Sequence, residues 1–241
     1  MIGWRARLGF LVPPGNPTVE KEMIAMAPEG VSLHFHRMVA RGTPGSLVGQ
    51  TERNRSMVEN IDDGVELLAM VKPNVIAIAH TATSYHLGRR GEADLLTRLE
   101  GVTGRRVVTA FGSVVHALER LNIRRLALGT PYSAEVTLQG KAHLEAHGLE
   151  VVKFDNVKGV ENIYDTTAEH AYRLAGSVDR DDAEAVFLSG TGMPTVSVLE
   201  MLEQDLGKPV ISSASAMMWH ALRLAGVGQP IENYGSLLTL R

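Results

Sequence analysis

The chain has 241 residues, a hydrophobic content of 44%, a net charge of −3 and no cysteine. This length accommodates one large α/β domain or two small ones, and the weak charge gives no basis for binding nucleic acid or an acidic membrane. The absence of cysteine excludes disulfides, thiolate metal sites and a cysteine nucleophile. The stretch MIGWRARLGFLVPP is too short for a signal peptide or a membrane span, so we expect a cytoplasmic protein.

Short apolar runs alternate with amphipathic stretches along the chain, which is typical of parallel sheets covered by helices. Strands are predicted at residues 7–12, 32–39, 74–79, 106–110, 125–129, 149–154, 184–188 and 208–212. A helix is predicted over residues 54–70, where apolar side chains from Met57 to Leu68 recur at helical spacing. Residues 195–206 and 216–225 show the same pattern.

The second half of the chain repeats blocks of the first. RLGFLVPPGN from Arg7 is echoed by RLALGTPYSA from Arg125, and GRRVVTAFGSVVHAL from Gly104 is echoed by GKPVISSASAMMWHAL from Gly207. The order of the blocks is the same in both halves. We interpret this as an α/β fold of two similar Rossmann-like lobes, each a four-stranded parallel sheet with helices on both faces, related by a pseudo-twofold axis. Convergence of unrelated strand–helix units is the alternative.

The two lobes should enclose a cleft between them. We expect residues 1–113 plus 214–241 to form the N-terminal lobe and residues 114–213 to form the C-terminal lobe. In open α/β sheets, ligands bind beyond the carboxyl ends of the strands. The cleft should therefore collect the loops at residues 13–16, 80–85, 130–133 and 189–193.

Two residues of these loops point to chemistry by their type and position. Asn16 precedes Pro17 at a predicted helix start, where free backbone N–H groups and the positive end of the helix dipole suit a carboxylate. Helix capping alone is the alternative for Asn16. His80, at the end of a buried strand, can exchange a proton near neutral pH, and a histidine hydrogen-bonded inside the fold is the alternative.

Other histidines and glycines give weaker signals. His143 and His147 are four residues apart on a predicted helix, which is metal-ligand spacing, but no HExxH pattern accompanies them and we expect this helix to be exposed. We therefore predict no metal site. His116 and His220 are expected to pack or to cap helices. The segment GTGMP lacks the GxGxxG spacing of a dinucleotide site.

Five segments follow one another in the order VPPGNPTVEKEM, HTATSYHLG, GTPYSAEV, LSGTGMP and YGSLL. Together they resemble the aspartate/glutamate racemase superfamily, in particular its maleate cis–trans isomerase and arylmalonate decarboxylase branch. The resemblance implies two Rossmann-like lobes that hold a small carboxylate between them, no metal or organic cofactor, and chemistry by one or two cysteines. His80 and Gly190 stand at the two cysteine positions, so we expect a retained pocket with altered chemistry.

The same resemblance implies which residues bind the substrate. Contacts to the substrate are implied for Asn16, Thr81, Tyr132 and Asn162. The loop that contains Ser189, Gly190 and Gly192 offers flexible backbone and hydroxyl groups where the second cysteine would lie. An isomerase would need a second proton-exchanging group opposite His80, which would be water or a hydroxyl of Thr191 or Ser189.

We therefore expect a cofactor-independent enzyme that acts on a small mono- or dicarboxylate through an enediolate-like intermediate. It would be of the isomerase or decarboxylase type, with His80 as acid or base in place of the family cysteine. Two alternatives stay open: a hydrolase or hydratase in which His80 activates water, and a non-catalytic protein that binds small acids. A homo-oligomer is expected from the resemblance, with no nucleic acid or membrane as a partner.

Overall fold

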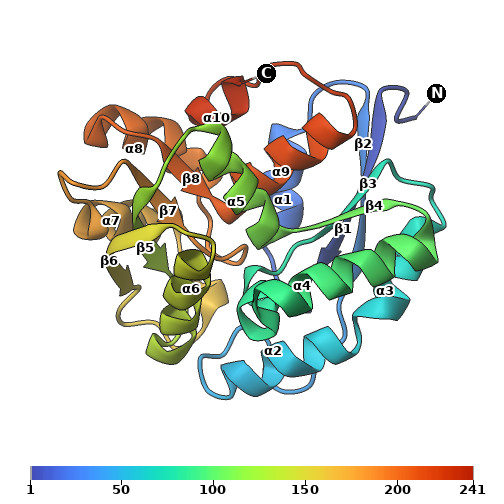
Figure 1. Cartoon of the computed structure of the whole chain (residues 1–241), viewed down its shortest axis with the longest axis horizontal. Coiled ribbons are helices and arrows are strands. Elements are labelled where there is room, and N and C mark those ends of the chain that lie inside the picture. The colour runs from blue at the N-terminus through green and yellow to red at the C-terminus, as the bar shows by residue number, and fades with distance from the viewer. Residues whose placement is uncertain (1, 241) are drawn as a thin grey trace.

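The computed structural model describes residues 2–240, in which eight strands form two four-stranded parallel sheets (Figure 1). The first sheet has the order β2-β1-β3-β4, with β1 at Ala6–Val12, β2 at Val31–Arg37, β3 at Val75–Ile78 and β4 at Arg106–Thr109. The second repeats this order as β6-β5-β7-β8, with β5 at Arg125–Thr130, β6 at Glu150–Asn156, β7 at Ala185–Leu188 and β8 at Val210–Ser212. The predicted strands and fold class are confirmed.

Helices connect the strands within the described residues. They are α1 Val19–Met26, α2 Gln50–Glu59, α3 Ile61–Ala69, α4 Thr81–Thr103, α5 Ala110–Arg120, α6 Ala134–Ala146, α7 Ala168–Val178, α8 Leu199–Leu206, α9 Ser213–Leu224 and α10 Ser236–Thr239, with 3-10 turns η1 Ile163–Asp165 and η2 Val196–Val198. No helix within residues 2–240 is long and apolar enough to cross a membrane.

The single helix predicted over residues 54–70 is instead two helices, α2 and α3, which meet at Asn60. Asn60 has φ −115° and ψ 26°, and its side-chain amide donates to the carbonyl of Ser56 at 2.7 Å. Asparagine competes for backbone hydrogen bonds in this way and so favours helix ends. Because Met57, Ile61 and Val65 are all buried, the apolar stripe continues across the break, and periodicity alone did not reveal it.

The two sheets share one hydrophobic core. A single cluster of buried side chains includes Phe10, Phe111 and Phe187, each 0% exposed. Helix α9 follows the last strand of the second sheet, yet it contacts β1, β3 and β4 of the first sheet and packs against α5 between the sheets (Figure 1). The strand ends of both sheets are therefore held in a fixed relation, while the lobe boundaries at residues 113 and 213 stay a prediction.

Helix α6 is not exposed along its length, and the sequence prediction was wrong on this point. It packs against α4 of the other lobe. His143 is 5% exposed, and its ring centroid lies 4.4 Å from that of Phe111. The residue pattern of a single helix does not show whether another lobe covers its polar face, so this contact could not be predicted from the sequence.

A buried carboxylate joins α1 to the loop after β7. Glu22 is 5% exposed, and its Oε1 accepts hydrogen bonds from the backbone N–H groups of Thr195 at 2.6 Å and Val196 at 2.9 Å. Its Oε2 has no partner among residues 2–240. Burial raises the pKa of Glu22 to about 7, because the two N–H donors offset only part of the cost of desolvating the charge.

This contact predicts a pH-dependent effect of Glu22→Gln. The pKa of Glu22 is raised from 4.5 to about 7 on folding, so the stability that it contributes is present below pH 4.5 and is lost as the pH rises through 7. The amide cannot ionise. We expect the variant to be more stable than the native protein at pH 8, by on the order of 3 kcal/mol, and to show little gain at pH 4.

Denaturant unfolding at both pH values measures this difference. Glu29→Gln removes an exposed carboxylate and serves as the control, for which we expect no comparable gain. An equal effect of Glu22→Gln at pH 4 and pH 8 would contradict the assignment of the raised pKa.

Candidate active site

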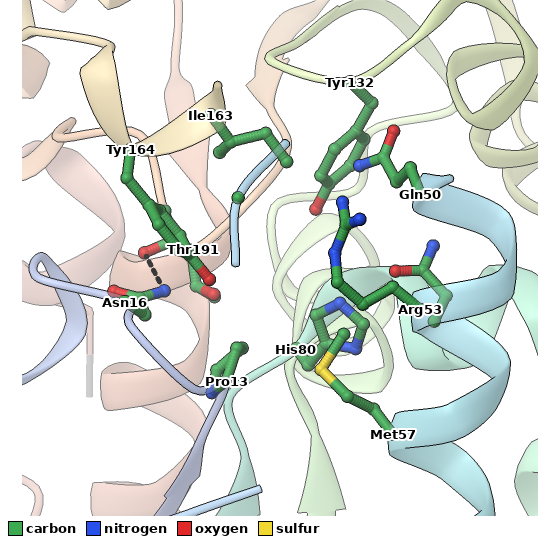
Figure 2. A pocket seen from close by; sticks show the side chains of 13 residues that line it. Pro13, Asn16, Gln50, Arg53, Met57, His80, Tyr132, Ile163, Tyr164 and Thr191 are labelled. Atoms are coloured by element: carbon green, nitrogen blue, oxygen red, sulfur yellow. Dashed lines mark hydrogen bonds between the residues drawn. The ribbon is translucent and has the colours of Figure 1, made fainter. Parts of the chain in front are cut away.

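A pocket lies where strands of both sheets end (Figure 2). Each of the four predicted loops contributes to its wall: Asn16 follows β1, His80 follows β3, Tyr132 follows β5 and Thr191 follows β7. The cavity is narrow, with a volume of about 30 Å³. The loops thus meet at one pocket, as the pseudo-twofold arrangement of the strands requires.

His80 is a buried, neutral imidazole. Its side chain is at the pocket wall, the residue is 8% exposed, and Nδ1 lies 2.9 Å from Oγ1 of Thr83. Burial, together with the positive charge of Arg53, lowers the pKa of His80 to about 3. If Thr83 donates to Nδ1, Nε2 carries the proton; if Nδ1 donates to Thr83, Nε2 is free to accept one. A neutral His80 can therefore accept a proton at Nε2 in one tautomer and donate a hydrogen bond from Nε2 in the other.

Arg53 is the main site residue that the sequence reasoning missed. Its side chain extends from α2 into the pocket between Tyr132 and His80 (Figure 2). Arg53 is 6% exposed; it donates to the carbonyls of Val48, at 3.0 Å, and Ser46, and it has no carboxylate in ion-pair contact among residues 2–240. A buried guanidinium without a counter-charge favours the binding of an anion, and its planar fork matches a carboxylate.

The sequence contains a pattern that indicates the part of the pocket wall formed by α2. Gln50, Arg53, Asn54 and Met57 all line the pocket. Their spacing places them on one face of α2, and this face continues as the apolar stripe that starts at Ile61. Polar residues within an otherwise core-facing stripe indicate a cavity at that end of the helix.

The side chain of Asn16 hydrogen-bonds to the start of α1 and to the second lobe. Its Oδ1 accepts hydrogen bonds from the backbone N–H groups of Thr18 at 2.9 Å and Val19 at 3.1 Å, and its Nδ2 donates to the carbonyl of Thr191 at 3.3 Å. Helix α1 begins at Val19, two residues later than predicted, so Asn16 is not the N-cap by position. It nevertheless satisfies free N–H groups at the start of the helix, as a cap does.

Two tyrosines provide neutral hydrogen-bond donors at the pocket. Burial raises the pKa of Tyr132 well above its ordinary value, and the hydroxyls of Thr81 and Ser189 interact with its phenol. Burial also raises the pKa of Tyr164 to about 12. Tyr164 donates to the carbonyl of Pro14 at 3.3 Å. Both phenols therefore keep their protons at neutral pH, but the single O–H of Tyr164 is already donated to Pro14.

The predicted hydroxyl groups differ in their positions. Thr191 lines the pocket, but its Oγ1 donates to the carbonyl of Ala79 at 2.7 Å. The hydroxyl of Thr81 donates to Oγ of Ser213 at 2.9 Å, and the hydroxyl of Ser189 lies 2.8 Å from that of Tyr85. Thr81 and Ser189 are completely buried and lie behind the pocket wall. Their direct contact with a substrate stays a prediction.

Asn162 does not line the pocket, but it binds a loop that does. Its Nδ2 donates to the carbonyl of Pro44 at 2.9 Å, and the neighbouring Ile163 donates its backbone N–H to the carbonyl of Gly45 at 2.7 Å. Ile163 and Gly45 both line the pocket. Asn162 therefore holds the loop that precedes α2 against the other lobe, which positions Arg53 indirectly.

Gly190 leaves no space for a side chain. Its φ is +97°, and a Cβ placed on it would lie 2.8 Å from Cγ of Pro131 and 3.2 Å from the hydroxyl of Tyr132. Its backbone N–H donates to Oγ of Ser213 at 3.1 Å. Gly192, which does line the pocket, would place a Cβ 2.8 Å from the side chain of Ile163. The second lobe therefore contributes backbone here, where the resemblance places a thiol.

Comparison with known proteins gives the family. The family model described as arylmalonate decarboxylase matches residues 8–238. The chain belongs to this family. It is 28% identical over 236 residues to arylmalonate decarboxylase of Bordetella bronchiseptica, with 95% of each chain covered. It is 26% identical over 241 residues to maleate isomerase of Nocardia farcinica, with 96% of this chain and 95% of the relative covered.

Solved structures agree with the family assignment. A maleate cis–trans isomerase from Nocardia farcinica with a covalently bound succinylcysteine intermediate superposes with a TM-score of 0.88 at 26% identity, covering 97% of this chain and 98% of that chain. A crystal structure of arylmalonate decarboxylase gives a TM-score of 0.82 at 25% identity, covering 96% and 98%. The resemblance is confirmed, and membership supports an enzyme of the isomerase or decarboxylase type. Because this family member has no cysteine, it cannot form a succinylcysteine.

The geometry at Gly190 predicts that Gly190→Ala destabilises the protein. The positive φ is strained for any residue with a Cβ, and the new methyl group would overlap Pro131. We expect a loss of roughly 1–3 kcal/mol in the free energy of unfolding. Denaturant unfolding of the variant measures it.

Gly176→Ala is a matched control. Gly176 lies inside α7, and a Cβ there would meet nothing within 4 Å. The control should be neutral or more stable by about 0.5–1 kcal/mol, because alanine favours a helix more than glycine does. Equal effects of the two substitutions would show that the loop at Gly190 adapts to a side chain.

Proposed function

We propose that this protein is a cofactor-independent enzyme that converts a small mono- or dicarboxylate through an enediolate-like intermediate, as a decarboxylase or an isomerase. His80 acts as its acid or base in place of the family cysteine. The observation that carries the proposal is the pairing of a neutral His80 with the unpaired, buried guanidinium of Arg53 in one small pocket.

Arg53 is proposed to bind the substrate carboxylate in a bidentate manner. Two of the five N–H groups of a guanidinium are used by Ser46 and Val48, which holds the fork in place and leaves the other N–H groups for a ligand. Tyr132 and the polar end of α2 would donate further hydrogen bonds. In such a water-poor pocket, fixed donors stabilise the charge that develops on an enediolate.

His80 is proposed to move the proton at carbon. Loss of carbon dioxide, or removal of a proton next to the carboxylate, leaves an electron pair on carbon that delocalises into the remaining carboxylate. In the decarboxylation, a His80 that has taken up a proton from solvent as the diacid binds would give it from Nε2 to that carbon; in the proton transfer, His80 would return the proton that it has removed. His80 is neutral in the free protein, and a bound carboxylate would raise its pKa by offsetting the charge of Arg53.

Decarboxylation requires the fewest groups of this pocket. Carbon dioxide itself leaves the electron pair behind, so one acid is sufficient to complete the reaction. Isomerisation through proton transfer needs a second group on the other side, where Gly190 offers none and the hydroxyl of Thr191 is bonded to a backbone carbonyl. The relatives are named for maleate and arylmalonate, and malonate-type diacids are the first candidates as substrates, because loss of carbon dioxide from them leaves the electron pair next to the second carboxylate.

Removal of the imidazole tests the role of His80. In His80→Asn the amide can keep the hydrogen bond to Thr83, but Nε2 is lost. We expect turnover of the diacid to fall about 10²–10⁴-fold, which is the usual contribution of a positioned acid or base. Proton NMR in deuterium oxide follows carbon dioxide loss, isomerisation and deuterium incorporation in one experiment.

Two comparisons make this test specific. His86→Asn changes an exposed histidine in α4, the helix that His80 precedes, and should leave turnover unchanged. The diacid should still raise the melting temperature of His80→Asn, because the carboxylate site is intact. Undiminished turnover in His80→Asn would exclude His80 as the acid or base, and binding without any chemical change in the native protein would indicate a small-acid binder.

Removal of the guanidinium tests the carboxylate site. We expect Arg53→Met to weaken binding of the diacid by roughly 1.5–3 kcal/mol, which is ten- to a hundredfold, since a hydrogen bond to a charged group is lost. Arg55→Met removes the same charge from the exposed face of α2 and should bind normally. Isothermal titration calorimetry measures both, and equal affinities of the two variants would contradict the assignment.

A further inference from the structure

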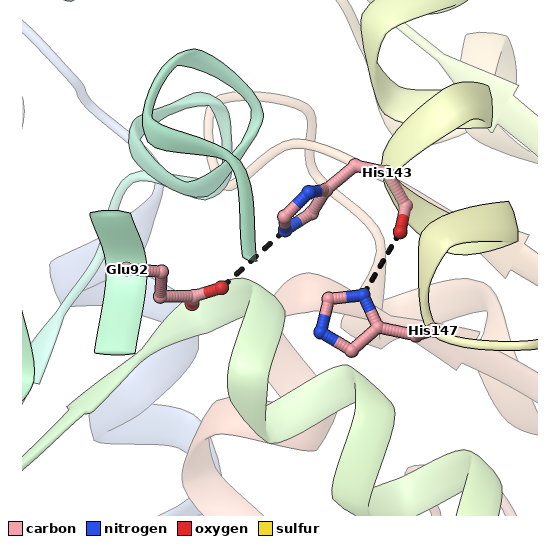
Figure 3. A group of neighbouring side chains, drawn as sticks. All are labelled: Glu92, His143 and His147. Carbon is pink, nitrogen blue, oxygen red and sulfur yellow. Dashed lines mark hydrogen bonds and ion pairs between the residues drawn. The ribbon is translucent and has the colours of Figure 1, made fainter. Parts of the chain in front are cut away.

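A second cluster of chemically active side chains lies outside the pocket, at the junction of the two lobes. Glu92 comes from α4, whereas His143 and His147 come from α6 and its end (Figure 3). One potential ligand atom from each residue lies within 4.8 Å of the other two. Glu92 and His143 are 6% and 5% exposed, so this is not an ordinary solvated surface pair.

The pair of His143 and Glu92 has a separation that suits a shared metal ion. Nε2 of His143 lies 3.3 Å from Oε2 of Glu92. A tetrahedral ion bound to nitrogen and oxygen at 2.0–2.2 Å places neighbouring ligand atoms about 3.3–3.5 Å apart. An ion between these two atoms requires little movement of them, with the proton of His143 moved from Nε2 to Nδ1, whereas a cluster of three ligand atoms within 4.8 Å of one another has to contract around the ion.

Hydrogen bonds already orient the carboxylate of Glu92. Its Oε1 accepts from the hydroxyl of Ser84 at 2.7 Å and from that of Thr109, which leaves Oε2 for His143. Burial alone would raise the pKa of Glu92, but the hydrogen bonds from His143, Ser84 and Thr109 hold it below its ordinary value. The carboxylate is therefore ionised and held in one orientation. Metal-binding carboxylates are commonly oriented by hydrogen bonds in this way.

His147 is oriented in the same manner. Its Nδ1 lies 2.9 Å from the carbonyl oxygen of His143 and donates to it, so Nε2 carries the free lone pair (Figure 3). Metal-binding histidines commonly donate their other N–H to a backbone carbonyl. His147 is only half-buried, which gives an ion and a water molecule access to the cluster.

An aromatic ring borders the cluster. The ring of Phe111 lies against both imidazoles, with centroid distances of 4.4 Å to His143 and 5.4 Å to His147. One carboxylate and two imidazoles beside an apolar ring form the two-histidine, one-carboxylate donor set that Zn²⁺ accepts, with water as the fourth ligand.

We infer that Glu92, His143 and His147 form a binding site for a divalent transition-metal ion, of which Zn²⁺ is the representative. The ion joins α4 of one lobe to α6 of the other. Because Glu92 also binds Ser84, four residues after His80, the site fixes the first turn of α4 relative to the second lobe. Its role is to stabilise the junction of the lobes and not to take part in the reaction at carbon.

The test uses the full-length, untagged protein after treatment with a chelator. Isothermal titration with Zn²⁺ should show one saturable site, and Zn²⁺ should raise the melting temperature. Co²⁺ should give the visible ligand-field absorption of a tetrahedral site. His147→Gln, at the accessible end of α6, should bind Zn²⁺ at least about tenfold more weakly and lose the Co²⁺ absorption.

Two further variants locate the site. Glu92→Gln should also lose Zn²⁺ affinity; should that variant fail to fold, His147→Gln decides the question. His116→Gln is the matched control, because His116 and His220 form another pair of adjacent imidazoles, with centroids 4.5 Å apart. The inference is overturned if the native protein shows no saturable site, if His147→Gln binds Zn²⁺ normally, or if His116→Gln abolishes binding instead.

Discussion

The guanidinium of Arg53 is buried without a counter-charge, and the organisation of the pocket depends on this one ion. Removing a cation from water is costly, and two backbone carbonyls offset only part of that cost. The same charge helps to keep His80 neutral. It also requires the loop before α2 to remain against the other lobe, because the carbonyls that hold the guanidinium belong to that loop. A bound anion would supply the counter-charge that Arg53 lacks among the described residues.

The sequence predicted the eight strands, their division into two sheets and the convergence of four loops at one pocket. These features follow from local patterns: buried strands read as apolar runs, and the ends of parallel strands lie at one edge of a sheet. His80 was found because a polar residue directly follows such a run, whereas the role of Tyr132 was implied by the family resemblance. The family resemblance added the nature of the ligand, which no local pattern contains.

The sequence reasoning failed where a side chain is defined by a partner far away in the chain. Arg53 looks like any charged residue of an amphipathic helix until the second lobe covers it. His143 looks exposed until α4 supplies Glu92, more than fifty residues earlier. The break at Asn60 was hidden because the apolar stripe continues across it. In each case the missing information is which surface meets which, and helical periodicity carries no such information.

The two lobes present unequal groups at equivalent positions. At the two positions that the resemblance assigns to cysteines, the first lobe has the imidazole of His80 and the second has the backbone of Gly190, with a φ that excludes a side chain. A planar enediolate held between them would meet a proton donor on one face alone. Under the proposed chemistry, a product with a new stereocentre would therefore form as a single enantiomer, and its handedness would report the side from which His80 approaches.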